Sequence, residues 1–144
     1  MSVYADTRLL ISYYILDSNS VSACGVINAM PDPLLFTGLH RLEMRNAFAL
    51  GVFRRVLTAA QAGAAWLDVE RDLRSGRLVP HPVNWTPVYR SAAQCAAAHS
   101  PTIGCRSLDV LHVALAKTLK VTESFTFDAR QKALALAVGM IVKP

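Results

Sequence analysis

The sequence predicts an α/β fold in which a short, mainly parallel central sheet is flanked by helices. Short apolar runs alternate along the whole chain with longer segments whose apolar residues recur at helical spacing. Strands that alternate with helices in this way usually pair in parallel. The chain has 144 residues, of which 53% are apolar and 17% charged. That composition and length suit a single domain with one large core, and we expect residues 1–144 to form it.

Cap and turn residues mark the boundaries of the elements in the first half. The apolar run Val3–Ala5 predicts a strand, and Asp6 is a candidate N-cap for a helix over 7–17. A second helix, beginning at Ser20 or Ser22, ends at the prolines that follow Met30. The further elements expected here are a strand at 34–37, a helix over 39–55, a helix between the cap Thr58 and Gly76, and a strand at 78–79.

The second half continues the same alternation. An alanine-rich helix is expected over 88–98, followed by a loop over 100–106 that contains a proline and a glycine. The segment 107–119 is apolar nearly all round, which predicts a central, buried helix. The last expected elements are a strand at 123–127, a helix over 129–137 and a strand at 140–142.

Four acidic residues lie where this fold would bury them: Asp6, Glu43, Asp109 and Asp128. Asp6 and Asp128 each follow an expected strand, and the carboxyl ends of parallel strands meet at one edge of a sheet. Glu43 shares a helical face with Leu39, and Asp109 lies in the first turn of the buried helix. A buried carboxylate is costly unless it is paired or holds a cation. Gathered together, the four predict a metal site and a hydrolytic enzyme.

The chemistry of that site follows from its donors. Four like charges repel one another unless a divalent cation lies among them. Oxygen ligands without a Cys/His spacing favour Mg²⁺, with Mn²⁺ as the alternative, over zinc.

Each acid also has a purely structural interpretation. Asp6 is a candidate helix cap, and Asp128 with Gln131 fits a capping box. Asp109 suits the positive end of its helix dipole. Glu43 has potential internal partners in its own helix, which are Arg41, Arg45 and Asn46.

The charge balance suggests the partner. The formal net charge is +5, and eleven of the fifteen cationic side chains are arginines. With the four acids set aside in a pocket, the rest of the chain carries +9. A basic exterior around an acidic hole suits a polyanion such as RNA.

The expected location is the cytoplasm. Three cysteines without ligand-like spacing predict idle thiols in a reducing compartment. No apolar run is long enough to cross a membrane, and the opening residues have no signal-like segment. We therefore expect no membrane association.

The ordered acidic motifs resemble those of PIN-domain ribonucleases, and especially of the VapC-type toxins of bacterial toxin–antitoxin pairs. The resemblance covers essentially the whole chain. Its segments are Tyr4-Ala5-Asp6-Thr7, Leu42-Glu43-Met44-Arg45-Asn46-Ala47, Leu108-Asp109-Val110-Leu111-His112-Val113-Ala114 and Thr126-Phe127-Asp128. It implies a PIN-like three-layer sandwich, metal-dependent RNA hydrolysis, a homodimer and a cognate antitoxin.

The resemblance also implies roles for particular residues. Asp6, Glu43, Asp109 and Asp128 take the family's catalytic and metal-binding positions. Thr7 and Thr126 match hydroxyl positions that support those carboxylates. Arg8 departs from the family pattern, which has a small or apolar residue there, and its role is left open.

Two other functional classes of protein are alternatives to the ribonuclease. A receiver-like phosphorylation domain also binds Mg²⁺ with acids at strand ends, but it needs an adjacent acidic pair that Asp6-Thr7-Arg8 does not supply. A catalytically silent PIN-like module that binds RNA or protein is the alternative to the enzyme.

Overall fold

A computed structural model describes residues 3–143 of the chain. These residues form two compact units, which are described one at a time. The first unit spans Thr7–Pro82. The second unit contains residues 3–6 and 83–143. The expectation that residues 1–144 form one domain stays a prediction.

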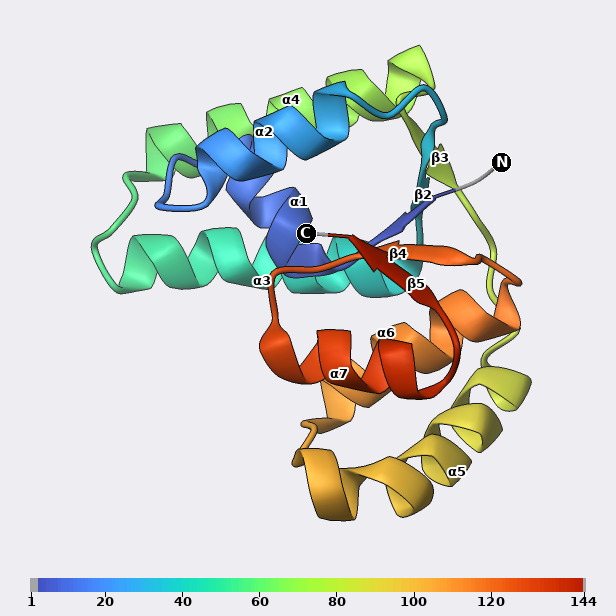
Figure 1. Ribbon diagram of the computed structural model, residues 1–144. Coiled ribbons are helices and arrows are strands. Elements are labelled where there is room, and N and C mark those ends of the chain that lie inside the picture. Colours follow the sequence, from blue (N-terminus) through green and yellow to red (C-terminus); the bar gives the residue numbers. More distant parts are fainter. Residues whose placement is uncertain (1–2, 144) are drawn as a thin grey trace. The chain divides into compact units, whose positions relative to one another are not determined.

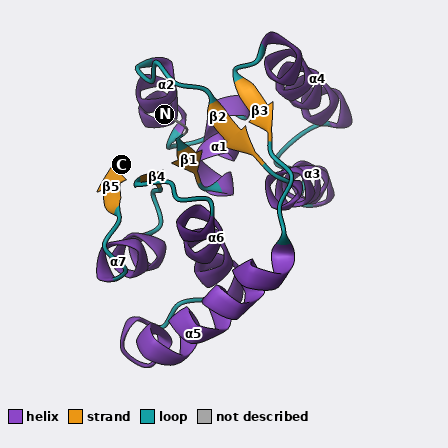
Figure 2. Ribbon diagram, turned by 90° about the vertical axis from the view of Figure 1, so that its right-hand side faces the viewer, coloured by secondary structure: helices purple, strands orange, loops and turns teal. Residues whose placement is uncertain are grey.

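The first unit combines four helices with a two-stranded parallel sheet (Figures 1 and 2). Its strands pair with Leu34 opposite Leu78. Helix α4 contacts strand β3 and helices α1 and α3. The elements are α1 (Thr7–Tyr14), α2 (Ser20–Asn28), β2 (Leu34–Phe36), α3 (Gly38–Phe53), α4 (Ala59–Ser75) and β3 (Leu78–Pro80).

The core of the first unit is made by apolar faces of these helices. Leu9, Leu10, Met44 and Val69 are completely buried. Helix α4 has the boundaries that its sequence predicts. The Thr58 hydroxyl accepts the N–H of Gln61 at 3.0 Å, and the Gln61 side chain accepts the N–H of Thr58 at 2.8 Å. Gly76, with φ of 78°, ends the helix in the left-handed region.

The second unit has a three-stranded parallel sheet in the order β1-β4-β5, with its three helices gathered on one side of the sheet (Figures 1 and 2). Ala5 pairs with Phe125, which fixes the register of β1. The elements are β1 (Tyr4–Ala5), α5 (Trp85–Ile103), α6 (Ser107–Thr118), β4 (Glu123–Phe125), α7 (Ala129–Ala137) and β5 (Ile141–Lys143).

Helix α6 is the central helix of the second unit, as its sequence predicts. Seven of its twelve residues are buried, and it contacts both α5 and α7. Its buried His112 is hydrogen-bonded through Nδ1 to the Tyr4 hydroxyl at 2.5 Å. This bond ties α6 to strand β1.

The predicted fold class is confirmed: short parallel strands are flanked by helices. Their pairing was not foreseen, since the described strands pair as one group of three and one group of two. Within residues 3–143, none of the helices combines the length and the hydrophobicity needed to cross a bilayer.

Several predicted boundaries were wrong, and those of three elements are the most informative. The first helix ends at Tyr14 and not at Asp17, whose carboxylate instead accepts the Ser12 hydroxyl of α1 and the backbone N–H of Asn19. Strand β4 ends at Phe125, two residues earlier than expected. Helix α5 starts at Trp85 and continues through Pro101 to Ile103, so the loop expected over 100–106 shrinks to three residues. Gly104, with φ of 71°, ends that helix.

Candidate active site

Asp6 is placed by the pairing of β1 with β4. It directly follows strand β1, as predicted, and its backbone N–H donates to the Phe125 carbonyl at 2.9 Å. The residue is only 1% exposed. A carboxylate at that depth needs strong polar partners.

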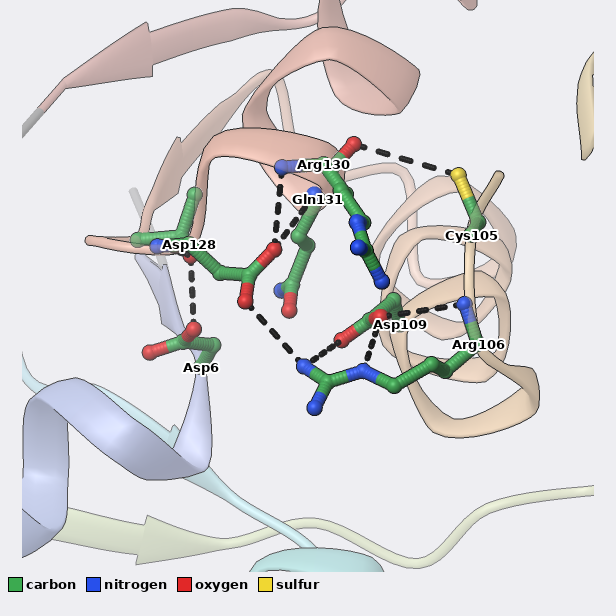
Figure 3. Close-up of polar contacts among 8 residues, drawn as sticks. Asp6, Cys105, Arg106, Asp109, Asp128, Arg130 and Gln131 are labelled. Atoms are coloured by element: carbon green, nitrogen blue, oxygen red, sulfur yellow. Dashed lines mark hydrogen bonds and ion pairs between the residues drawn. The ribbon is translucent and has the colours of Figure 1, made fainter. Parts of the chain in front are cut away.

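Thr126 supplies one of those partners. Its hydroxyl donates to Asp6 Oδ2 at 2.6 Å and accepts the backbone N–H of Asp128 at 3.0 Å. Thr126 is itself buried. One side chain therefore links the carboxylate at the end of β1 to the segment that carries Asp128 (Figure 3).

Asp128 caps helix α7. Its Oδ1 accepts the backbone N–H groups of Arg130 at 3.0 Å and Gln131 at 2.9 Å. Of the capping box predicted for Asp128 and Gln131, the N-cap part is therefore confirmed. Because β4 ends early, Asp128 does not immediately follow the strand, contrary to prediction, and Thr126 and Phe127 lie between. The other oxygen, Oδ2, takes part in a different contact.

That contact is with Arg106, which joins two of the predicted acids. Its Nη2 donates to Asp128 Oδ2 at 3.1 Å and to Asp109 Oδ1 at 3.3 Å. Its Nε donates to Asp109 Oδ2 at 3.0 Å. The guanidinium therefore lies between the two carboxylates, as Figure 3 shows.

Asp109 is nearly buried, with a side chain 8% exposed. It also accepts the backbone N–H of Arg106 at 3.1 Å, so it satisfies an unpaired donor at the start of α6. The Asp109 hydrogen bond, followed by the charges of Asp109 and Asp128, raises the pKa of Arg106 above its ordinary value. Arg106 is thus a permanent cation between two acids.

Glu43 belongs to the first unit, on helix α3. Its Oε1 accepts the Thr7 hydroxyl at 2.8 Å. Thr7 is buried and begins helix α1. The two threonines singled out in the sequence therefore each donate to one of the four acids, Thr7 to Glu43 and Thr126 to Asp6.

The arginines near Glu43 in sequence have other neighbours. The Arg45 guanidinium lies 3.6 Å from the centre of the Trp66 ring, and that of Arg41 lies 5.6 Å from it. Positions two apart on a helix are about 200° apart around its axis. Arg41 and Arg45 thus point to the side of α3 opposite Glu43. Arg8 is an exposed residue of α1, and its role stays open.

Three of the four predicted acids therefore form one connected network in the second unit. Asp6 is joined to Asp128 through Thr126, and Asp128 to Asp109 through Arg106. Within residues 3–143, no group of three or more His, Cys, Asp or Glu side chains lies in an arrangement ready to hold a metal ion. The carboxylate pair of Asp109 and Asp128 holds a guanidinium.

Cys105 lies beside this network but does not contribute a thiolate. Its Sγ contacts the Arg130 carbonyl at 3.9 Å (Figure 3). Burial, followed by the charge of Asp109, raises the pKa of its thiol. It therefore stays protonated near neutral pH, and the three cysteines that the structure describes are free thiols.

Arg106 is the residue that reasoning from the sequence missed. The signal was present, because Arg106 stands three positions before Asp109 at the start of a helix, the spacing of a side-chain pair on one face. Its second partner, Asp128, is 22 residues further along the chain. That contact requires the tertiary fold.

No protein-family model and no curated protein sequence matches this chain. Solved structures match it over nearly its whole length. The Sarcin-Ricin loop cleaving toxin VapC20 of Mycobacterium tuberculosis has a TM-score of 0.69 at 15% identity, with 99% of each chain covered.

Two further structures show the same similarity. VapBC2 from Rickettsia felis, bound to a DNA fragment from its promoter, has a TM-score of 0.66 at 12% identity, covering 99% of this chain and 98% of that one. FitAcB from Neisseria gonorrhoeae has a TM-score of 0.63 at 17% identity, with 99% and 96% covered. The resemblance to VapC-type toxins is thereby confirmed in the fold.

Proposed function

We propose that this chain is a Mg²⁺-dependent endoribonuclease and the toxin of a bacterial toxin–antitoxin pair. The observation that carries the proposal is the connected network of Asp6, Asp109 and Asp128, in a fold shared with an RNA-cleaving toxin. Glu43 is the fourth acid of the proposed site. The reaction is hydrolysis of a phosphodiester bond by water.

The residues present suit a divalent metal. Their donors are carboxylate oxygens, the ligands that Mg²⁺ and Mn²⁺ prefer. Asp109 and Asp128 already share a cationic group, the guanidinium of Arg106, so the pair is arranged to receive positive charge. We propose that Asp6, Asp109 and Asp128 hold the ion, with Glu43 bound directly or through water. When bound, such an ion supplies a water of lowered pKa and neutralises charge on the phosphate.

The chain's own residues orient and hold these ligands. The Thr126 hydroxyl donates to one oxygen of Asp6 and so fixes the direction of the other oxygen. The backbone N–H groups at the start of α7 hold Asp128 Oδ1, which leaves Oδ2 for a cation. Thr7 restrains Glu43 in the same way. Asp6, Asp128 and Glu43 are thus each positioned by a neutral donor.

RNA is the proposed substrate, and its backbone is the part that the protein would hold. The formal net charge of +5 supports attraction to a polyanion. Arginines around the site would position phosphates without reading sequence. The free thiols of the three cysteines suit the reducing cytoplasm, where such an enzyme would act.

A cognate antitoxin and a homodimer complete the proposal. The similar VapBC2 and FitAcB structures are complexes with antitoxins, which supports a partner of this kind. A homodimer is supported by large apolar side chains on the surface of the first unit, among them Leu16, Val21 and Phe53. Ile27 of α2 is completely buried and does not contribute to that surface.

The alternative is a catalytically silent PIN-like module that binds RNA or protein. One observation favours it: Arg106 already neutralises two of the acids. A silent module would keep the guanidinium in place permanently. It would neither bind a divalent ion nor cleave RNA.

Cleavage of a structured RNA by the purified protein separates the two functions. Asp6→Asn removes a charge while it preserves the shape of the side chain, and cleavage should be lost. Asp68→Asn is the matched control, because Asp68 is a half-exposed aspartate of α4 whose side chain pairs with Arg71 at 2.8 Å. Equal cleavage by the wild type, Asp6→Asn and Asp68→Asn would refute the proposed site.

A further inference from the structure

The side chain of Arg106 uses the same oxygens that the proposed metal would need. Its guanidinium nitrogens donate hydrogen bonds to both oxygens of Asp109 and to Oδ2 of Asp128, with N···O distances of 3.0 to 3.3 Å. The two-pronged contact with Asp109 is the geometry in which arginine binds carboxylates most strongly. It is a direct ion pair between one cation and two acids of the second unit.

The burial of the three side chains is unequal. Those of Asp109 and Asp128 are 8% and 11% exposed, whereas that of Arg106 is 56% exposed. The guanidinium therefore covers the carboxylates from the solvent side. An arginine with this exposure can turn into water at small cost, since exposed ion pairs are weak. The side chains of Asp109 and Asp128 are nearly buried and cannot turn into the solvent in the same way.

We infer that Arg106 is an internal counter-ion, which holds Asp109 and Asp128 in the metal-free protein and leaves them when a divalent cation binds. The inference rests on the proposed function and adds a competitor to it. The lone pairs of a carboxylate oxygen that accept hydrogen bonds from a guanidinium are not available to a hard cation in the same place. A cation bound between the two acids would also repel the guanidinium.

The exchange has two consequences. Without metal, the guanidinium offsets the repulsion between two nearly buried carboxylates, so the empty site is stable. When the metal binds, the ion pairs of Arg106 with the two acids are broken, and their free energy is lost from the binding free energy of the ion. Metal binding is therefore weaker than the same carboxylates would allow, and cleavage starts only where the ion outcompetes Arg106.

A different role for Arg106 predicts the opposite effect. If the guanidinium serves as a scaffold that aligns Asp109 and Asp128 for the ion, its removal should weaken metal binding. The sign of the change in affinity therefore decides between a competitor and a scaffold.

Titration calorimetry with Mn²⁺ measures that sign without an activity assay. Arg106→Gln removes the charge and the fork, and Mn²⁺ should bind several-fold to about tenfold more tightly than to the wild type. Arg130→Gln is the matched control, because Arg130 belongs to the same unit and its hydrogen bonds with Asp128 and Cys105 use only its backbone atoms. It should change the affinity less, through the long-range field alone.

Arg106→Lys keeps the charge but not the fork, and it decides the matter if the glutamine variant does not fold. It should bind Mn²⁺ more tightly than the wild type and less tightly than Arg106→Gln, because an ammonium group cannot hold Asp109 with two parallel bonds. An affinity equal to or below that of the wild type in the folded variant would overturn the inference.

The possible failures are distinguishable. If wild type binds Mn²⁺ and Arg106→Gln binds it no more tightly than Arg130→Gln does, the competition is wrong while the metal site stands. If neither wild type nor the Arg106 variants bind Mn²⁺, both the metal site and the competition are wrong.

Discussion

Glu43 of the first unit and the pair Asp109 and Asp128 of the second unit are held by different partners. In the first unit Glu43 accepts the hydroxyl of Thr7 at 2.8 Å. In the second unit Asp109 and Asp128 share the guanidinium of Arg106. A hydroxyl orients a carboxylate and leaves its charge almost unchanged, whereas a guanidinium neutralises it.

This difference indicates where a cation is required. Two nearly buried carboxylates that lie close together require a cation to neutralise them. In the second unit Arg106 is that cation. Glu43 is half-buried, so keeping it charged costs less than for a buried carboxylate. The second unit is therefore the part in which exchange of one cation for another has the largest consequences.

The largest expected effect is a difference in RNA cleavage between a substitution of Asp109 and one of Glu43. Asp109→Asn should reduce RNA cleavage by more than the roughly 10- to 100-fold that loss of an outer ligand partner costs, because it removes a proposed direct ligand. Glu43→Gln should stay within that range if Glu43 acts through water. Single-turnover cleavage rates at saturating Mg²⁺ test this, and a larger loss in Glu43→Gln than in Asp109→Asn would reverse the comparison.

Removal of the two threonine hydroxyls should lower the unfolding free energy by different amounts. Thr126→Val leaves the 1%-exposed Asp6 and the N–H of Asp128 each short of one partner, which should cost about 1–3 kcal/mol of unfolding free energy. Thr7→Val removes a donor to the more exposed Glu43 and should cost about 0.5–1.5 kcal/mol. Urea unfolding measures both, and equal costs would show that burial of the acid does not matter.

Alkaline pH should act on the first unit through Tyr14. Burial, followed by the hydrogen bond to Asp72, raises the pKa of Tyr14 well above its ordinary value of 10.0. A raised pKa means that this group's contribution to stability is complete below the unfolded value and is lost as pH rises above it. The unfolding free energy of the wild type should then fall more steeply than that of Tyr14→Phe, by up to about 1.4 kcal/mol per pH unit. Parallel curves above pH 10 would contradict this.

The smallest expected effect concerns the arginines of α3. Arg45→Ala should cost about 0.5–1 kcal/mol, because its guanidinium lies 3.6 Å from the centre of the Trp66 ring. Arg41→Ala should cost less, since its distances to Trp66 and Phe36 are above 5 Å. Thermal unfolding of the two variants tests the ranking, and a greater loss in Arg41→Ala would show that ring contact does not decide it.

Local chemistry explains which elements could be predicted from the sequence. Thr58 and Gln61 cap the N-terminus of α4, and Gly76 ends the helix in the left-handed region. Both signals depend only on neighbouring residues, so both ends of α4 were predicted correctly. Asp6 was placed at the end of its strand by the same kind of local pattern. The end of α5 was missed because Pro101 removes only one helical hydrogen bond, while Gly104 provides the left-handed residue that ends the helix.

The candidate site was predictable in its residue types but not in its electrostatics. Carboxylates on apolar faces are visible in a sequence, and so are the threonines beside Asp6 and Asp128. The direction of a long, flexible arginine side chain is not, because it depends on partners brought together by folding. The sequence therefore singles out Arg8, two positions after Asp6, and gives no sign of the contact between Arg106 and Asp128, which are 22 residues apart.

The most direct test of the central claim is removal and return of the metal during RNA cleavage. Purified wild-type protein, free of any partner, is treated with excess EDTA and assayed on a structured RNA, and Mg²⁺ or Mn²⁺ is then added beyond the chelator. The account predicts no cleavage in EDTA, recovery with either ion, and no recovery in Asp6→Asn. Cleavage that persists in EDTA at the wild-type rate, and equally in Asp6→Asn, would contradict it.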